Sequence, residues 1–293
     1  MDYQNLIASP FVTYLALLLT IISLWFSQWL WLIGLSAAIV IGYATGVLTG
    51  SAILWIAILG ICLWYYHRLR NESHRRFSRI ALAAVIVVVA LLLGLHALPG
   101  FHNVTVAREL VLSPDGAPFT LSLSFDKTVA GLVIIALLYR DRLRRRHEWR
   151  DALRTALPVI PVTIVIVMGV GLAIGYVRFD PKWTSFFWIW ATVNLFFTVL
   201  SEEAFFRAFI QRDIASVLAQ WRFGNITAIL VAALLFGLAH FAGGAKYVAL
   251  AAIAGVGYGF ALSRSRRVEM AMLCHFSLNA THFLMFTYPF HIG

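Results

Sequence analysis

Residues 80–98 read IALAAVIVVVALLLGLHAL, and this stretch decides the fold class of the chain. It contains no Asp, Glu, Lys or Arg, and it is close to the length of about 20 apolar residues that an α-helix needs to cross a bilayer. The loop before it, residues 67–79, is rich in arginine. Basic loops stay on the cytoplasmic side of a membrane, so we expect this loop in the cytoplasm. We predict that residues 80–98 form a transmembrane helix that crosses outward from it.

The composition of the whole chain agrees with a membrane location. Of the 293 residues, 61% are hydrophobic and 12% are charged, whereas soluble domains carry about 25% charged residues. The net charge of +10 comes mainly from arginines in loops between apolar runs. Orientation in the membrane explains that charge, so we expect no nucleic-acid partner. Cys62 and Cys274 lie inside apolar segments and indicate neither a disulfide nor a zinc framework.

Similar apolar runs follow one another along most of the chain and predict an all-α fold. We expect a polytopic transmembrane helix bundle of about eight to nine spans, in a multi-pass protein of the bacterial inner (plasma) membrane surrounded by lipid. A small β-hairpin near residues 103–125 is the exception, because 113–116 read SPDG, a turn signal, and 119–125 alternate apolar and polar residues. We divide the chain into anchoring helices with this hairpin, 1–150, and a chemical half, 151–293.

Two adjacent carboxylates, Glu202 and Glu203, follow the apolar run 186–200. An ionised side chain at the centre of a membrane helix costs about 2.5–3.5 kcal/mol, so such groups are kept when they are paired or used. Glu203 and Arg207 are four residues apart and can form an ion pair on one helix face. Glu202 points elsewhere, without a sequence-local partner, and suits a general base. The alternative is a helix end at the membrane surface, with Ser201 as N-cap.

Three more polar groups lie on two later apolar helices. His240 ends an apolar helix with no other ionisable residue, and it is either functional or a packing residue. His275 and Asn279 share a helix face. An amide and an imidazole can stabilise an oxyanion, and the alternative is interhelical hydrogen bonding.

The order of these motifs resembles the CPBP family, which comprises CAAX prenyl proteases and bacteriocin-processing or immunity proteins. The residues that carry the resemblance are Glu202-Glu203-x-x-x-Arg207, Phe236-x-x-x-His240 and His275-x-x-x-Asn279. The resemblance covers roughly residues 155–290 and implies a metal-independent, intramembrane glutamate-type endopeptidase (a membrane-embedded hydrolase, CAAX protease-like) acting on a peptide or membrane-anchored protein.

The resemblance also implies a role for each residue. Glu202 activates a water, Glu203 with Arg207 supports it, His240 helps to hold or activate the water, and His275 and Asn279 stabilise the oxyanion. We expect no cofactor. A Glu with two His can ligate zinc, but the sequence contains no His-Glu-x-x-His and no cysteine cluster.

Two other functions stay open, a non-catalytic membrane scaffold or immunity protein and an ion-coupled transporter. The peptidase hypothesis also faces a geometric difficulty. The helices of His240 and His275 are predicted to run in the same direction, with His240 late in its helix and His275 early. At 1.5 Å per residue the two side chains then differ by about 10 Å in depth, unless the helices tilt or the first is extended.

Overall fold

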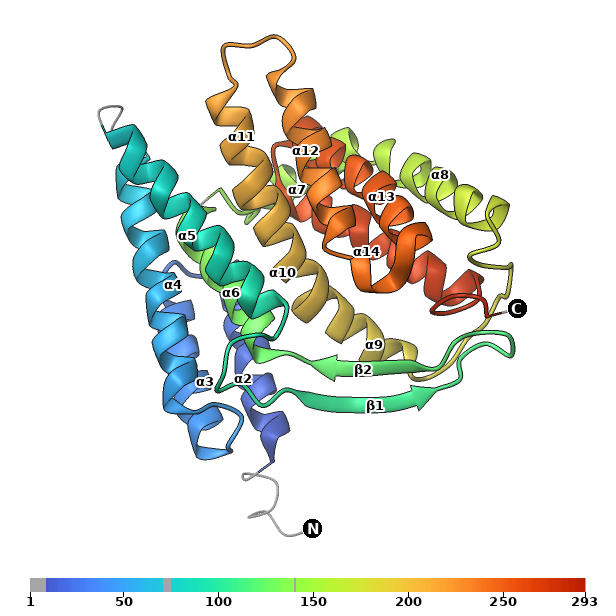
Figure 1. The fold of residues 1–293 in the computed structure, drawn as a ribbon, viewed down its shortest axis with the longest axis horizontal. Helices are drawn as coiled ribbons and strands as arrows, with labels where there is room; N and C mark the ends of the chain where they lie inside the picture. Colours follow the sequence, from blue (N-terminus) through green and yellow to red (C-terminus); the bar gives the residue numbers. More distant parts are fainter. Residues whose placement is uncertain (1–8, 71–74, 140, 293) are drawn as a thin grey trace. The chain divides into compact units, whose positions relative to one another are not determined.

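The computed structural model of the protein describes residues 9–70, 75–139 and 141–292. The described chain is helical apart from one two-stranded sheet (Figure 1). It divides into two compact units that interleave along the sequence. The first comprises Met1–Thr105, Ser122–Arg140 and Phe196–Ser201, and the second comprises Val106–Leu121, Asp141–Leu195 and Glu202–Gly293. The predicted division near residue 150 stays a prediction.

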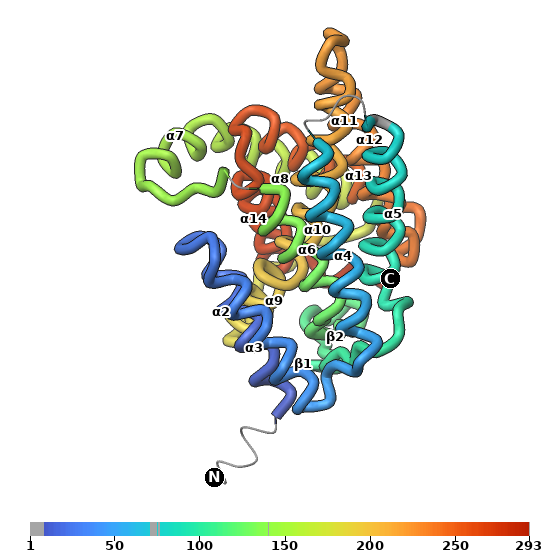
Figure 2. The backbone as a smooth tube through the Cα atoms, turned by 90° about the vertical axis from the view of Figure 1, so that its left-hand side faces the viewer, coloured from blue at the N-terminus to red at the C-terminus, as the bar shows by residue number. Residues whose placement is uncertain are grey.

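The first unit is built from apolar helices that pack in pairs. Two short helices lie side by side (Figures 1 and 2) and share a hydrogen bond of 2.7 Å between the hydroxyls of Thr13 and Thr45. Two longer helices pack against each other and against α6. The helices are α2 (Pro10–Ser23), α3 (Leu30–Ala44), α4 (Gly50–Leu69), α5 (Arg76–Gly94) and α6 (Phe125–Leu138).

Helix α6 is short, but it is buried on nearly every side. Its first turn holds Asp126, whose carboxylate lies 2.8 Å from His96 Nδ1 and accepts hydrogen bonds from the Asn103 amide. The Asn103 side-chain oxygen in turn accepts from the Phe125 backbone N–H at 2.9 Å. These contacts join the end of α5 to the start of α6. The negative charge of Asp126 is itself favourable there, because it lies at a helix N-terminus.

The predicted β-hairpin is present. Strands β1 (Val104–Leu110) and β2 (Phe119–Leu123) form a two-stranded sheet. The SPDG segment between them closes through a hydrogen bond of 3.0 Å from Gly116 N–H to Ser113 O. The Ser113 hydroxyl also accepts from the Tyr288 backbone N–H, which ties this loop to the C-terminal tail within the second unit.

The other helices belong to the second unit, except for residues 196–201 in η2 and α10, which belong to the first. Residues 187–217 form one continuous helical run, and α12 and α13 pack closely, with α8 and α14 against α13 (Figure 1). The elements are α7 (Arg146–Ala156), α8 (Val159–Ala173), α9 (Phe187–Val193), η2 (Asn194–Val199), α10 (Leu200–Glu203), η3 (Ala204–Gln211), α11 (Arg212–Val217), α12 (Gly224–Leu238), η4 (Phe241–Gly243), α13 (Gly244–Ser265) and α14 (Val268–Met285).

The helices are apolar enough for a membrane protein, as predicted. In the described ranges, four helical segments are long and apolar enough to span a bilayer, or five if the bent pair α7–α8 counts as one span. The apolar helices α2, α3 and α12 are shorter, with 14 or 15 residues, against about 20 for a full crossing. The all-α fold with a small hairpin is therefore confirmed, and the number of spans is smaller by this length criterion than the eight to nine expected.

Candidate active site

The two adjacent carboxylates lie midway along the helical run 187–217, between two π-helical segments. Helix α10 ends at Glu203, with η2 before it and η3 after it. A π-helical turn inserts an extra residue into an α-helix and is frequent at functional sites. It departs from ideal α-helical spacing, so the directions of the side chains around it cannot be taken from a regular 3.6-residue period.

Glu203 and Arg207 form the predicted ion pair. Glu203 Oε2 lies 3.2 Å from Arg207 Nε, and both side chains are completely buried. Arg207 also donates from Nη2 to the Gly255 carbonyl at 3.1 Å. Its guanidinium lies over the Phe236 ring, 4.6 Å from the centroid. A buried charge needs partners. Arg207 has an ion-pair partner on α10, a hydrogen-bond acceptor on α13 and an aromatic ring on α12.

Glycine on α13 makes the contact with Arg207 possible. A Cβ at Gly255 would lie 3.0 Å from the Ala233 Cα and 3.2 Å from Arg207 Nη2. One turn later the pattern repeats, because Gln211 Nε2 donates to the Gly259 carbonyl at 3.0 Å. Two side chains of η3 thus bind two carbonyls of α13 that are one helical turn apart. The absence of a side chain at both glycines lets these helices approach closely.

His275 lies between the two carboxylates. Its Nδ1 is 2.9 Å from Glu203 Oε1, and its Nε2 is 3.8 Å from Glu202 Oε2. A carboxylate that is ionised can only accept a hydrogen bond, so Nδ1 donates to Glu203. The imidazole stacks on the Tyr258 ring, with centroids 4.3 Å apart and planes at 13°. The ring is therefore held in place by a hydrogen bond and an aromatic face.

The position of Glu202 differs from the sequence-based expectation that it points away from Glu203. Glu202 is buried, and its carboxylate faces the second nitrogen of the same histidine. The reason is that His275 presents nitrogens on both edges of one ring, so two successive residues of α10 can reach it. The sequence could not show this contact, because it joins residues that are far apart along the chain.

His240 follows α12 and has one nitrogen engaged. Its Nδ1 lies 2.7 Å from the Phe236 carbonyl oxygen, which can only accept, so Nδ1 donates. In the neutral imidazole the other nitrogen, Nε2, then carries a lone pair. The ring packs edge-on against Tyr247, with centroids 5.1 Å apart. This tautomer leaves Nε2 able to accept a hydrogen bond from a water or to bind a metal.

The two histidines line one cavity of about 70 Å³ inside the second unit. A cavity needs about 10–15 Å³ for one water, so this one has room for a few. The predicted 10 Å difference in depth does not separate them. Helix α12 is not extended but ends at Leu238, and His240 lies in the turn that follows. The cavity is lined by Val167, Met168, Tyr176, Phe236, His240, Tyr247, Leu250, Ala251, Ala254, Tyr258, His275, Leu278 and His282.

Asn279 is not among the residues that line this cavity. Its side-chain amide donates to the Asn194 side-chain oxygen at 3.2 Å. Asn194 begins the π-helical segment η2, so this contact joins α14 to the helix that carries Glu202. Sequence analysis did not select Asn194, and no local pattern marks it. Its partner lies 85 residues away.

Four aromatic and histidine side chains near the site were also not selected from the sequence. Tyr258 stacks on His275, and Tyr247 contacts His240. His282 lines the cavity two turns after His275. Its spacing of seven residues indicates a neighbour of the site, although it was not among the selected residues. Tyr176, in the loop after α8, also lines the cavity, and burial raises its pKa to about 12, so its hydroxyl stays protonated at neutral pH.

No group of three or more His, Cys, Asp or Glu side chains in the described part of the chain is arranged to hold a metal ion. Glu202, Glu203 and His275 are close to one another, but His275 uses Nδ1 for Glu203. Independence from metal stays a prediction.

Comparison with known proteins adds one finding. Residues 183–281 match the family of Rce1-like type II CAAX prenyl endopeptidases. The match includes all six predicted site residues and leaves out the hairpin and the first unit's long helices. It confirms the resemblance seen in the motifs and indicates a membrane endopeptidase of the CAAX protease type. No curated protein and no solved structure matches the chain.

Proposed function

We propose, on the premise that residues 183–281 match type II CAAX prenyl endopeptidases, that the chain is a glutamate-type intramembrane endopeptidase. It hydrolyses a peptide bond in a membrane-associated protein or peptide. The observation that carries the proposal is that His240 and His275, from separate helices, line one cavity. Glu202 and Glu203 do not line it themselves, but both contact His275.

A water in this cavity is the nucleophile. Glu202 accepts its proton, and His240 accepts a second hydrogen bond through Nε2, which aligns the water. Support comes from the Nδ1 hydrogen bond of His240 to Phe236 O, which fixes the tautomer, and from the water-sized volume beside the ring. A positioned general base contributes about 10²–10⁴-fold to a rate.

The buried charges around Glu202 favour this role. Glu202, Glu203 and Arg207 together carry a net charge of −1 when all are ionised. The proton that the water gives up would neutralise the cluster, and a neutral cluster is favoured in a low-dielectric interior. The 3.8 Å approach of His275 Nε2 to Glu202 Oε2 gives the abstracted proton a route toward the imidazole, from which it can reach the leaving amine.

The oxyanion of the tetrahedral intermediate needs preorganised donors. We assign this role to Asn279 with His275. Asn279 lies one helical turn after His275 and donates to Asn194 in the absence of substrate. When substrate binds, the Asn279 amide releases Asn194 and donates its hydrogen bond to the substrate oxygen instead. Asn194 therefore acts as a resting-state partner that holds the amide in position.

The apolar walls of the cavity fit a substrate that reaches the site from within the bilayer. We place the protein in a plasma membrane, the bacterial inner membrane, with the arginine-rich segments 67–79 and 140–154 in the cytoplasm. A farnesylated peptide ending in a CAAX-type tetrapeptide is the appropriate first substrate, because the matched family is named for this class.

The test measures cleavage of this peptide by the purified protein in liposomes. Glu202→Gln and His240→Ala are each expected to lower the turnover by about 10²-fold or more. Glu109→Gln is the matched control, because Glu109 is an exposed residue of β1. Cleavage in H₂¹⁸O should place one labelled oxygen in the new carboxylate in a single turnover.

Unchanged cleavage by folded Glu202→Gln would overturn the assignment of the base. Absence of cleavage by the wild-type protein, with ion flux through the liposomes that requires Glu202, would instead establish a transporter. Chelator treatment of an active preparation completes the test, since loss of activity would contradict a mechanism without metal.

A further inference from the structure

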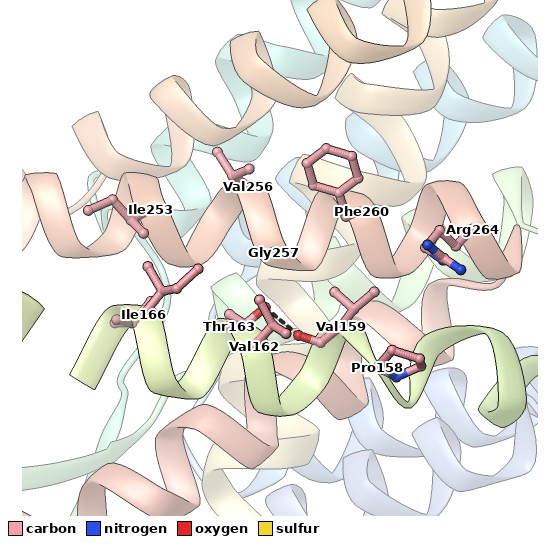
Figure 3. A pocket seen from close by; sticks show the side chains of 11 residues that line it. Pro158, Val159, Val162, Thr163, Ile166, Ile253, Val256, Gly257, Phe260 and Arg264 are labelled. Carbon is pink, nitrogen blue, oxygen red and sulfur yellow. Dashed lines mark hydrogen bonds between the residues drawn. The ribbon is translucent and has the colours of Figure 1, made fainter. Parts of the chain in front are cut away.

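A groove runs between α8 and α13, outside the cavity described above. Its volume is about 510 Å³, within the range of about 300–1,000 Å³ that is typical of small-molecule sites. Figure 3 shows the side chains of both helices that line it. All but two of these residues are apolar or glycine. The lining comprises Pro158, Val159, Val162, Thr163, Ile166, Val167, Ile253, Val256, Gly257, Phe260 and Arg264.

The floor of the groove forms where the two helices approach most closely. A Cβ at Gly257 would collide with the Thr163 side chain. The Thr163 hydroxyl is satisfied within its own helix by a hydrogen bond of 2.8 Å to the Val159 carbonyl (Figure 3). The floor therefore offers no free hydrogen-bond donor from this residue. The groove can be filled by hydrocarbon without leaving a polar group unpaired.

The groove has one charged end and one apolar end. Pro158 and Arg264 lie at the first, and Ile166 and Ile253 at the second (Figure 3). Arg264 is exposed, and in the described part of the chain no hydrogen bond or ion pair engages its side chain. This end also lies next to the basic helix α7, which packs against α13. An anion is the complementary group for this end.

The length of the groove matches one leaflet of a bilayer. Arg264 and Ile253 are separated by eleven positions on α13, or about 16 Å at 1.5 Å per residue. The hydrocarbon core of a bilayer is about 30 Å thick, so the groove reaches from the basic surface to the membrane centre. A bound molecule should therefore carry an anionic group at the surface and an apolar chain that points toward the midplane.

We infer that this groove binds an anionic phospholipid of the cytoplasmic leaflet. One acyl chain lies along the apolar walls, and the phosphate lies beside Arg264. Val167 lines both the groove and the cavity of the candidate site, so the end of the acyl chain packs against the wall of that cavity. The inference concerns lipid binding alone and does not depend on the proposed protease activity.

The experiment compares two lipids with the same chains, palmitoyl-oleoyl phosphatidylglycerol and palmitoyl-oleoyl phosphatidylcholine. Each is titrated into the purified full-length protein in detergent, and bound lipid is counted by native mass spectrometry. We expect phosphatidylglycerol to bind about fivefold more tightly, the effect of one basic side chain on an anionic headgroup. Arg264→Gln should abolish this preference.

Two further variants separate the groove from a general effect of positive charge. Arg222→Gln removes an exposed arginine from the loop between α11 and α12 and should leave the preference unchanged. Val162→Trp places a large side chain in the groove from an already exposed position and should reduce binding of both lipids. A melting curve for each variant verifies that it is folded.

Equal binding of the two lipids by the wild-type protein would overturn the inference. The inference would also be wrong if Arg264→Gln and Arg222→Gln behave alike, or if Val162→Trp retains wild-type binding, because the lipid would then occupy a different surface.

Discussion

The protein contains two histidine–carboxylate pairs with nearly the same geometry and different surroundings. In the first unit His96 Nδ1 lies 2.8 Å from Asp126 Oδ2, and in the second unit His275 Nδ1 lies 2.9 Å from Glu203 Oε1. The side chain of His96 is 46% exposed, whereas that of His275 is 5% exposed. A short contact between an imidazole and a carboxylate therefore does not by itself identify a site.

The surroundings of the two pairs explain the difference. Asp126 accepts hydrogen bonds from Asn103 and from the backbone of Lys127. The bond from Asn103 ties the start of α6 to the residue just before β1. His275 instead has a second carboxylate at its other nitrogen, an aromatic ring on its face and a cavity beside it. The first pair organises a chain connection, and the second has the surroundings on which the proposed proton transfer rests.

The largest expected effect is that of Glu203→Gln. This change leaves Arg207 as a buried charge without its ion-pair partner, at a cost of about 3–5 kcal/mol in the free energy of unfolding. Denaturant titration in mixed micelles measures it. The double variant Glu203→Gln with Arg207→Met should recover part of the stability without recovering activity. Equal stability of Glu203→Gln and the wild-type protein would show that the pair is not buried as described.

A smaller effect is expected from Gly255→Ala, which acts on the same cluster from α13. The added Cβ would crowd Ala233 and Arg207 Nη2, and overpacking of this kind costs about 1–3 kcal/mol. Peptide cleavage should fall as well, because Arg207 positions Glu203. Gly169→Ala, in α8, provides the comparison, because a Cβ added there would meet no atom within 4 Å and the Arg207 contact stays intact. A Gly255→Ala protein with full activity and stability would separate Arg207 from the site.

Asp126→Asn tests the other side of the comparison. The amide replaces one acceptor oxygen by a donor that faces the Asn103 amide, and an unsatisfied buried group costs about 1–3 kcal/mol. Melting temperature should fall, whereas turnover by the folded protein should stay at the wild-type value. A loss of turnover without a loss of stability would contradict the structural role of the first pair.

His96→Asn should have the smallest effect. His96 is half-exposed, and buried Asp126 keeps its hydrogen bonds from Asn103 and Lys127 when His96 is replaced, so the loss should be about 0–1 kcal/mol. His96 also has a positive φ of 57°, which asparagine tolerates better than most residues. The melting temperature and the cleavage rate should both change little. His275→Asn is the matched variant in the second unit, and it should abolish cleavage. If both variants behave alike, the distinction between the pairs is wrong.

Local sequence was sufficient for the features that depend on neighbours along the chain. The Glu203–Arg207 pair follows from a separation of four residues on one helix, and the hairpin follows from the SPDG turn between alternating segments. Sequence was not sufficient for Glu202, whose contact with His275 crosses from α10 to α14, or for Asn194, the partner of Asn279.

The amino-acid sequence alone determined that the chain is an apolar bundle of helices, which residues carry the chemical groups, and which family their order resembles. It did so because hydrophobic length, turn chemistry and helical spacing are local properties. Tertiary structure decided that His240 and His275 line one cavity, that both glutamates reach the same imidazole, and that Arg264 closes one end of a groove between α8 and α13. Those arrangements depend on the depth and tilt of helices that are distant in sequence. They also depend on how closely the helices approach, and Gly255 and Gly257 allow that approach because they have no side chain.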